Sequence, residues 1–77
     1  MTIQVFYFAS LSEQLGKIED QLISETPITA AFIWQQLNPQ QVMPDNTLVA
    51  INQNYAKLDD LVQANDELAF FPPVTGG

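Results

Sequence analysis

Two adjacent prolines, Pro72 and Pro73, constrain the fold of this chain most, because they directly follow the apolar run 67–71. Proline has a fixed φ and no amide hydrogen, so a strand that ends at Phe71 cannot extend its hydrogen-bond ladder beyond that residue. The chain must leave the sheet there. We therefore predict one folded domain over residues 1–71 and an extended, flexible tail over residues 72–77.

The tail ends in a diglycine preceded by Val74 and Thr75. These residues offer too little apolar surface to pack by themselves, and Gly76 and Gly77 have no Cβ to block passage through a narrow channel. The chemistry that such a tail provides is the α-carboxylate of Gly77, which a partner would have to activate, for example as an acyl adenylate. The alternative is a chain end without function, which is the general expectation for terminal residues. The prolines and the diglycine together favour the functional interpretation.

Composition excludes several classes of function. The 77 residues include no Cys and no His, so the chain has no disulfide framework, no thiolate nucleophile and none of the usual transition-metal ligands. We therefore expect no catalytic groups and no bound cofactor. Nine acidic residues against two basic ones give a formal charge of −7, which argues against nucleic acid and favours docking on basic proteins. Solubility alone also explains an acidic surface.

No apolar run approaches the ~20 residues of a membrane-spanning helix, and the first residues lack the layout of a signal peptide. These observations predict a cytoplasmic protein that does not bind membranes.

The first strand is predicted over residues 2–8, where β-branched and aromatic residues begin with strict alternation. Its predicted core residues are Ile3, Val5 and Tyr7. Phe6 and Phe8 then face outward, and an exposed aromatic pair indicates a partner surface. A short strand within residues 18–24 should pair with the first.

The final strand, residues 67–71, should place Leu68 and Phe70 inward. Phe71 would then lie outward, beside the exposed aromatic residues of the first strand if the two strands pair.

Two helices are expected. Ser10 and Glu13 fit a capping box for a short helix that Gly16 ends. The main helix begins behind Thr29, or behind Thr26 with Pro27 in the first helical position. Its apolar face has helical spacing, and Asn38-Pro39 ends it; this face consists of Ala30, Ile33, Trp34 and Leu37. Trp34 could stack on a base or a pterin, but core packing is the favoured interpretation.

The middle of the chain predicts a β-hairpin, with strands over residues 47–51 and 55–57 and a polar turn at 52–54. Tyr55, just past the turn, could lie beside the tail. Residues 58–62 suit a single helical turn. Asp59 and Asp60 within it could suggest a cation site, although neighbouring side chains diverge and a solvated turn is favoured.

The run 70–77, Phe-Phe-Pro-Pro-Val-Thr-Gly-Gly, closely resembles the C-terminus of the molybdopterin synthase small subunits, which are ubiquitin-like sulfur carriers. The resemblance extends through residues 49–53 and 65–69 and, more loosely, 3–9. It implies an α+β fold of the ubiquitin-like β-grasp type, with a mixed sheet packed on one main helix. Pattern alone predicts only a small α+β domain. The Ser12-Glu13-Gln14 segment departs from the charge usual in the family.

The resemblance also implies a mechanism. A ubiquitin-activating-type enzyme would use ATP to adenylate Gly77, and a persulfide donor would convert it to a thiocarboxylate. The large subunit would accept the tail, where the sulfur attacks a cyclic pyranopterin precursor. The chain would thus be a non-catalytic, sulfur-donating subunit of a heterotetramer. Partner contacts are expected from the aromatic surface and the tail: Phe8, Tyr55, Phe71, Pro72, Pro73, Val74 and Thr75.

Three alternatives remain open at this point. The chain could carry sulfur for thiamine or nucleoside thiolation, although the residues before the diglycine argue against this. It could be a ubiquitin-like modifier that forms isopeptide bonds with lysines. It could also be an acidic binding module whose tail has no role.

Overall fold

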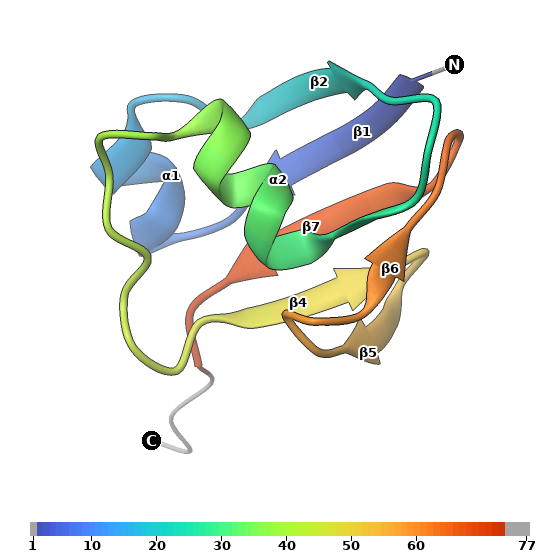
Figure 1. The fold of residues 1–77 in the computed structure, drawn as a ribbon. Helices are drawn as coiled ribbons and strands as arrows, with labels where there is room; N and C mark the ends of the chain where they lie inside the picture. Colours follow the sequence, from blue (N-terminus) through green and yellow to red (C-terminus); the bar gives the residue numbers. More distant parts are fainter. Residues whose placement is uncertain (1, 74–77) are drawn as a thin grey trace.

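The computed structural model describes residues 2–73, which form a five-stranded mixed sheet with helix α2 (Ala30–Leu37) across one face (Figure 1). The strand order is β2-β1-β7-β4-β5. Strands β1 and β7 are parallel, and the other neighbours are antiparallel. The strands are β1 (Thr2–Tyr7), β2 (Glu19–Ile23), β4 (Leu48–Ile51), β5 (Asn54–Ala56) and β7 (Glu67–Phe71). This arrangement confirms the predicted α+β class and the β-grasp topology.

Strand β7 occupies the middle of the sheet, between β1 and β4. Alternation along it sends Leu68 and Phe70 into the core, where neither side chain is exposed to solvent. Both predictions for these residues are confirmed, as is the inward orientation of Ile3, Val5 and Tyr7 from β1. The strand ends at Phe71, directly before the two prolines.

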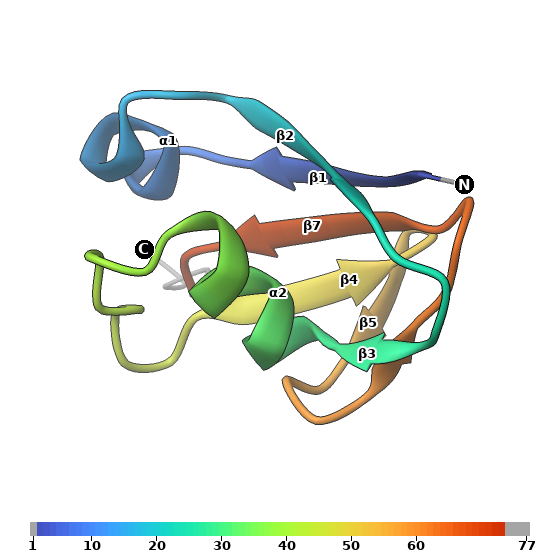
Figure 2. The same ribbon diagram turned by 45° about the horizontal axis from the view of Figure 1, so that its top comes forward.

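Helix α2 (Ala30–Leu37) covers the inner face of the sheet (Figure 2). Thr29 is its N-cap and accepts a hydrogen bond on Oγ1 from the Phe32 amide at 3.1 Å, so the helix begins behind Thr29 and not behind Thr26. Ala30, Ile33 and Trp34 are buried as predicted. None of the helices in residues 2–73 is long and apolar enough to cross a membrane.

Three aromatic rings fill the core at the end of the sheet where β7 stops. Tyr7 stacks on Phe70 with ring centroids 5.9 Å apart, and Trp34 meets both rings edge-on at 6.1 and 5.2 Å. Such arrangements contribute about 0.5–1.5 kcal/mol per pair beyond the area they bury. The inner side of the sheet is therefore firmly packed at the end of β7.

Helix α1 (Ser10–Leu15) begins differently from the prediction. Ser10 is the first helical residue rather than the N-cap, and the preceding Ala9 has φ 52° and ψ −130°. The Leu11 amide donates to the Phe8 carbonyl at 3.1 Å, so residues 8–11 form a type II′ turn. The predicted capping box is wrong because this tight turn, which buries Leu11 behind the outward-facing Phe8, moves Ser10 into the helix. Gly16 ends the helix at φ 72° as predicted.

A second, two-stranded sheet pairs β3 (Ile28–Thr29) with β6 (Leu61–Val62). The prediction of one helical turn over residues 58–62 is wrong at its end. A turn covers 58–59 with a bend at 60, but Val62 is fully buried beside β3. The carbonyls of Leu58 and Asp60 also accept the first amides of α2, which gives this segment a structural role.

Candidate functional site

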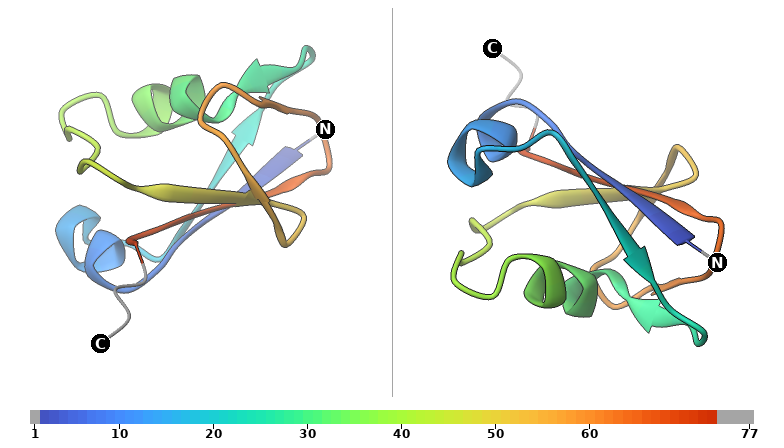
Figure 3. Two further views of the ribbon diagram at one scale, coloured as in Figure 1. Left: turned by 90° about the horizontal axis from the view of Figure 1, so that it is seen from below. Right: turned by 90° about the horizontal axis from the view of Figure 1, so that it is seen from above.

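The side of the sheet opposite α2 carries an apolar surface. Figure 3 shows α2 on one side of the sheet, and within residues 2–73 no helix crosses the middle of the other side. The exposed Ile23, at the end of β2, points to that side. Side-chain alternation and the strand register place seven further apolar residues there. We call them the outer face: Phe6, Phe8, Leu48, Ala50, Tyr55, Ala69 and Phe71.

The structure brings the three predicted aromatic contact residues to this one surface. Phe8 is 51% exposed and Tyr55 is 77% exposed, whereas Phe71 is partly buried. The rings of Tyr55 and Phe71 lie 5.8 Å apart between centroids. The Phe8 amide donates to the Phe70 carbonyl at 3.1 Å, which fixes the Phe8 backbone beside the end of β7. Exposed aromatic residues gathered in this way are typical of a protein-docking surface.

The predicted tail begins at the edge of the outer face. Pro72 is partly buried and Pro73 is exposed. Val74, Thr75, Gly76 and Gly77 lie outside the described residues, so their predicted roles remain predictions, as do the domain boundary and the contacts of the two prolines.

Acidic side chains flank the apolar surface on the side of β2 and at the end away from the tail. Glu19 lies opposite Phe6 in the β1–β2 register, and Glu67 lies opposite Gln4 in the β1–β7 register. Both share the outer side with Phe6 because directly paired residues point to the same side of a sheet. With the formal charge of −7, this rim favours a partner with basic groups around an apolar centre.

A buried polar network supports the aromatic end of the outer face from the inner side. The Tyr7 hydroxyl donates to Asp20 Oδ2 and accepts from Asn38 Nδ2, each at 3.1 Å. Lys17 Nζ pairs with the same Asp20 oxygen at 2.5 Å. Burial raises the pKa of Tyr7 above its ordinary value of 10.0, the Asn38 donor opposes this rise, and the Asp20 carboxylate adds to it. The hydroxyl therefore stays neutral and links β1, β2 and the end of α2.

The polar turn residue Asn52 has a structural role. Its side chain accepts from the Glu67 amide at 2.9 Å and donates to Asp66 at 3.0 Å, and its own φ is 52°. These bonds attach the β4–β5 hairpin to the start of β7. The interpretation of Asn52 as a turn residue is confirmed.

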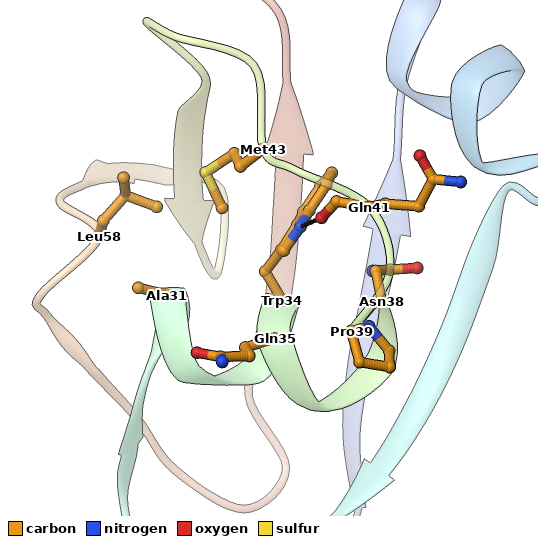
Figure 4. A pocket seen from close by; sticks show the side chains of 8 residues that line it. All are labelled: Ala31, Trp34, Gln35, Asn38, Pro39, Gln41, Met43 and Leu58. Carbon is orange, nitrogen blue, oxygen red and sulfur yellow. Dashed lines mark hydrogen bonds between the residues drawn. The ribbon is translucent and has the colours of Figure 1, made fainter.

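A cavity of about 320 Å³ lies on the other side of the molecule, between α2 and the segments around Met43 and Leu58 (Figure 4). Trp34 lines it and donates from Nε1 to the Gln41 carbonyl at 2.9 Å. Only 4% of Trp34 is exposed, which confirms it as a core residue. The described part of the chain contains no cluster of three or more potential metal-ligating side chains.

Sequence reasoning missed three members of the outer face: Leu48, Ala50 and Ala69. The signal was present, because strict alternation in two neighbouring strands assigns them to the side opposite Val49 and Phe70. Their exposure, however, depends on the order of the strands in the sheet, which the pattern of each strand does not specify.

A mixed sheet around one main helix, with an apolar outer face beside the departing C-terminal segment, defines a ubiquitin-like β-grasp protein. The ThiS family matches residues 5–77, and the chain belongs to that family.

Similar proteins include the molybdopterin synthase sulfur carrier subunit of Haemophilus influenzae, which is 63% identical, with 97% of this chain and 99% of that protein covered. SAMP1 of Haloferax volcanii, a small archaeal modifier protein, has a TM-score of 0.76 at 26% identity, with both chains fully covered. A chain in the complex of subunits 1 and 2 of the Helicobacter pylori molybdopterin-converting factor has a TM-score of 0.64 at 17% identity, again over both full chains.

Proposed function

We propose that this protein is the sulfur carrier subunit of a molybdopterin synthase. The observation that carries the proposal is the outer face, an aromatic surface at the point where Pro72 and Pro73 lead away from β7. The relative from Haemophilus influenzae bears this function in its name and covers nearly the whole chain. In this proposal the outer face docks on the large subunit, and the tail reaches into that subunit's active site.

The chemistry takes place at Gly77. An adenylating enzyme joins the Gly77 carboxylate to AMP with release of pyrophosphate, which turns the carboxylate oxygen into a leaving group. The terminal sulfur of a persulfide then displaces AMP, and a thiol cleaves the resulting acyl disulfide to leave a thiocarboxylate. A thiocarboxylate is a soft nucleophile, so sulfur transfer to the pyranopterin precursor requires no Cys or His from this chain.

Two partners other than the large subunit follow from this chemistry. The adenylating enzyme supplies the ATP site, and the persulfide donor supplies the sulfur. A chain of this fold in the Helicobacter pylori complex of subunits 1 and 2 supports the large subunit as the docking partner. The acidic rim at Glu19 and Glu67 supports a basic surface on that partner.

Intact mass spectrometry tests the proposal. The purified chain is incubated with ATP, a cognate adenylating enzyme and a persulfide donor, and its mass should rise by the difference between sulfur and oxygen. A chain without Gly77 is the control and should keep its mass. The loaded protein should then convert the precursor when mixed with the large subunit. A full chain that keeps its mass with an active adenylating enzyme would refute the proposal.

A ubiquitin-like modifier is the second candidate, because the fold is also that of SAMP1 of Haloferax volcanii. This function would attach Gly77 to lysines of other proteins. The same incubation, with a cell extract added, distinguishes the two functions. Adducts on other proteins indicate conjugation, whereas a mass change confined to the carrier indicates sulfur loading.

A further inference from the structure

Two neighbouring alanines occupy the middle of the outer face. Ala50 of β4 lies directly opposite Ala69 of β7. On one side Phe6 lies opposite Ala69, and on the other side Tyr55 lies opposite Ala50. Across four neighbouring strands, the paired residues are therefore Phe6, Ala69, Ala50 and Tyr55, in that order. Two methyl groups lie between two large aromatic rings, and we call this pair of alanines the alanine strip.

Other side chains bound the strip at both ends of the strands. Toward the tail, Phe71 lies opposite Leu48, while Tyr55 lies opposite Ala50. Because these two rings nevertheless come within 5.8 Å of each other, they meet across β4 beside Ala50. Away from the tail, the next paired residues are Gln4 and Glu67, which are polar. The strip is thus a small apolar surface, bounded at one end by the rings of Phe71 and Tyr55 and at the other end by the polar pair Gln4 and Glu67.

Packing of the core does not require alanine at either position. The core is filled by the inward neighbours Val49, Leu68 and Phe70, all at most 1% exposed. Ala50 and Ala69 are only partly buried and point to the opposite side. Strand surfaces favour β-branched and aromatic residues, and alanine is depleted there. Residue types that a strand disfavours, and that bring no gain in the packing of the core, are expected at functional sites.

We infer that the alanine strip receives one large apolar side chain of the docking partner, which stands at the centre of the interface. The inference rests on the proposed function, since the partner is the large subunit. Interfaces concentrate binding in a few large anchors that fill complementary positions near the centre. Here this chain offers methyl groups between rings, so the anchor must come from the other protein. Basic groups around that anchor would face Glu19 and Glu67.

Valine substitutions test this inference without disturbing the core. Ala50→Val and Ala69→Val place a branched side chain in the strip, and both should fold with unchanged or higher thermal stability because valine suits strands better. Each should weaken binding to the purified large subunit at least about tenfold. Gln21→Val is the matched control, because Gln21 of β2 lies opposite Gln4, so this change adds valine on the same side but outside both the strip and the Gln4–Glu67 pair. This control should bind within about threefold of the wild type.

A second measurement uses the absence of cysteine from the sequence. In Ala50→Cys the single thiol should react with a maleimide in the free carrier and react at least about tenfold more slowly in the complex, because a buried thiol is inaccessible. Val42→Cys, at a position that is 85% exposed in the loop after α2, should react equally in both states.

The two measurements also separate this inference from the proposed function. If the wild-type chain and the large subunit do not bind, the proposed function fails. If they bind, but the valine variants bind equally well or the Ala50→Cys thiol stays reactive in the complex, the alanine strip is not the receptor.

Discussion

The hydroxyl of Tyr7 offers a sharp test of what stabilises the inner side of the sheet. Tyr7→Phe removes one oxygen that bonds Asp20 and Asn38, each at 3.1 Å. Tyr7 is 2% exposed and Asn38 is 6% exposed, so the Asn38 amide group loses its acceptor in a place that water barely reaches. A buried donor left without a partner costs about 1–3 kcal/mol. Loss of the hydrogen bond to Asp20 should cost little, because Asp20 is partly exposed and keeps its pairing with Lys17.

We therefore expect Tyr7→Phe to lower the free energy of unfolding by about 2 kcal/mol, or Tm by roughly 10 °C for a domain of this size. Urea denaturation should show the loss as a shift of the midpoint with an unchanged m value. A loss below about 0.5 kcal/mol would refute the reasoning, because it would mean that Asn38 finds another acceptor at little cost.

A double-mutant cycle with Asn38→Ala isolates the bond itself. If Tyr7 and Asn38 interact as the structure shows, the two losses should not add, and the coupling free energy should be about 1 kcal/mol. If the two losses add, the stability lost in Tyr7→Phe does not come from the hydrogen bond between Tyr7 and Asn38. Affinity for the large subunit should remain unchanged throughout, since both residues lie on the inner side of the sheet.

Three further predictions concern capping, pH and docking. Thr29→Ala removes the acceptor of the Phe32 amide and should cost about 1 kcal/mol in urea denaturation, whereas Ser10→Ala, which is not at an N-cap, should change stability by less than about 0.5 kcal/mol. Because the folded state raises the pKa of Tyr7 above 10.0, its contribution is complete below pH 10 and is lost as the pH rises further, so the stability difference between the wild type and Tyr7→Phe should shrink above pH 10. Phe71→Ala should weaken binding to the large subunit more than about tenfold in calorimetry while costing only about 1 kcal/mol of stability, and unchanged affinity would remove Phe71 from the interface.

The sequence predicted the elements whose signals are local. Alternation identified β1 and β7 and the inward side of each, and helical spacing identified the buried side of α2. The two prolines located the end of β7 at Phe71, because an imide nitrogen cannot donate to the ladder. Outward-facing aromatic residues need a partner, which predicts contacts for Phe8 and Phe71. Tyr55 is predicted as a contact residue because it follows the turn and could lie beside the tail.

The errors arose where tertiary packing decided the outcome. Ser10 has the sequence of an N-cap, but burial of Leu11 requires a turn that shifts the helix start by one residue. Leu58 and Leu61 have the i, i+3 spacing of a helical turn, but Leu61 and Val62 pair with β3 and Val62 is buried there. Alternation assigns Ala50 and Ala69 to the outer side but does not show that they are neighbours. Their importance depends on the register between β4 and β7, which no single strand contains.

Strand β7 connects the folding of the domain to its proposed function. It lies between β1 and β4, so its pairing joins both ends of the chain to the middle hairpin. One side of it supplies Leu68 and Phe70 to the core, and the other side supplies Ala69 and Phe71 to the outer face. Since side chains alternate strictly, a shift of one residue would exchange these two sets. The core therefore fixes which residues form the proposed docking surface, because it sets the register of β7 up to its end at Phe71.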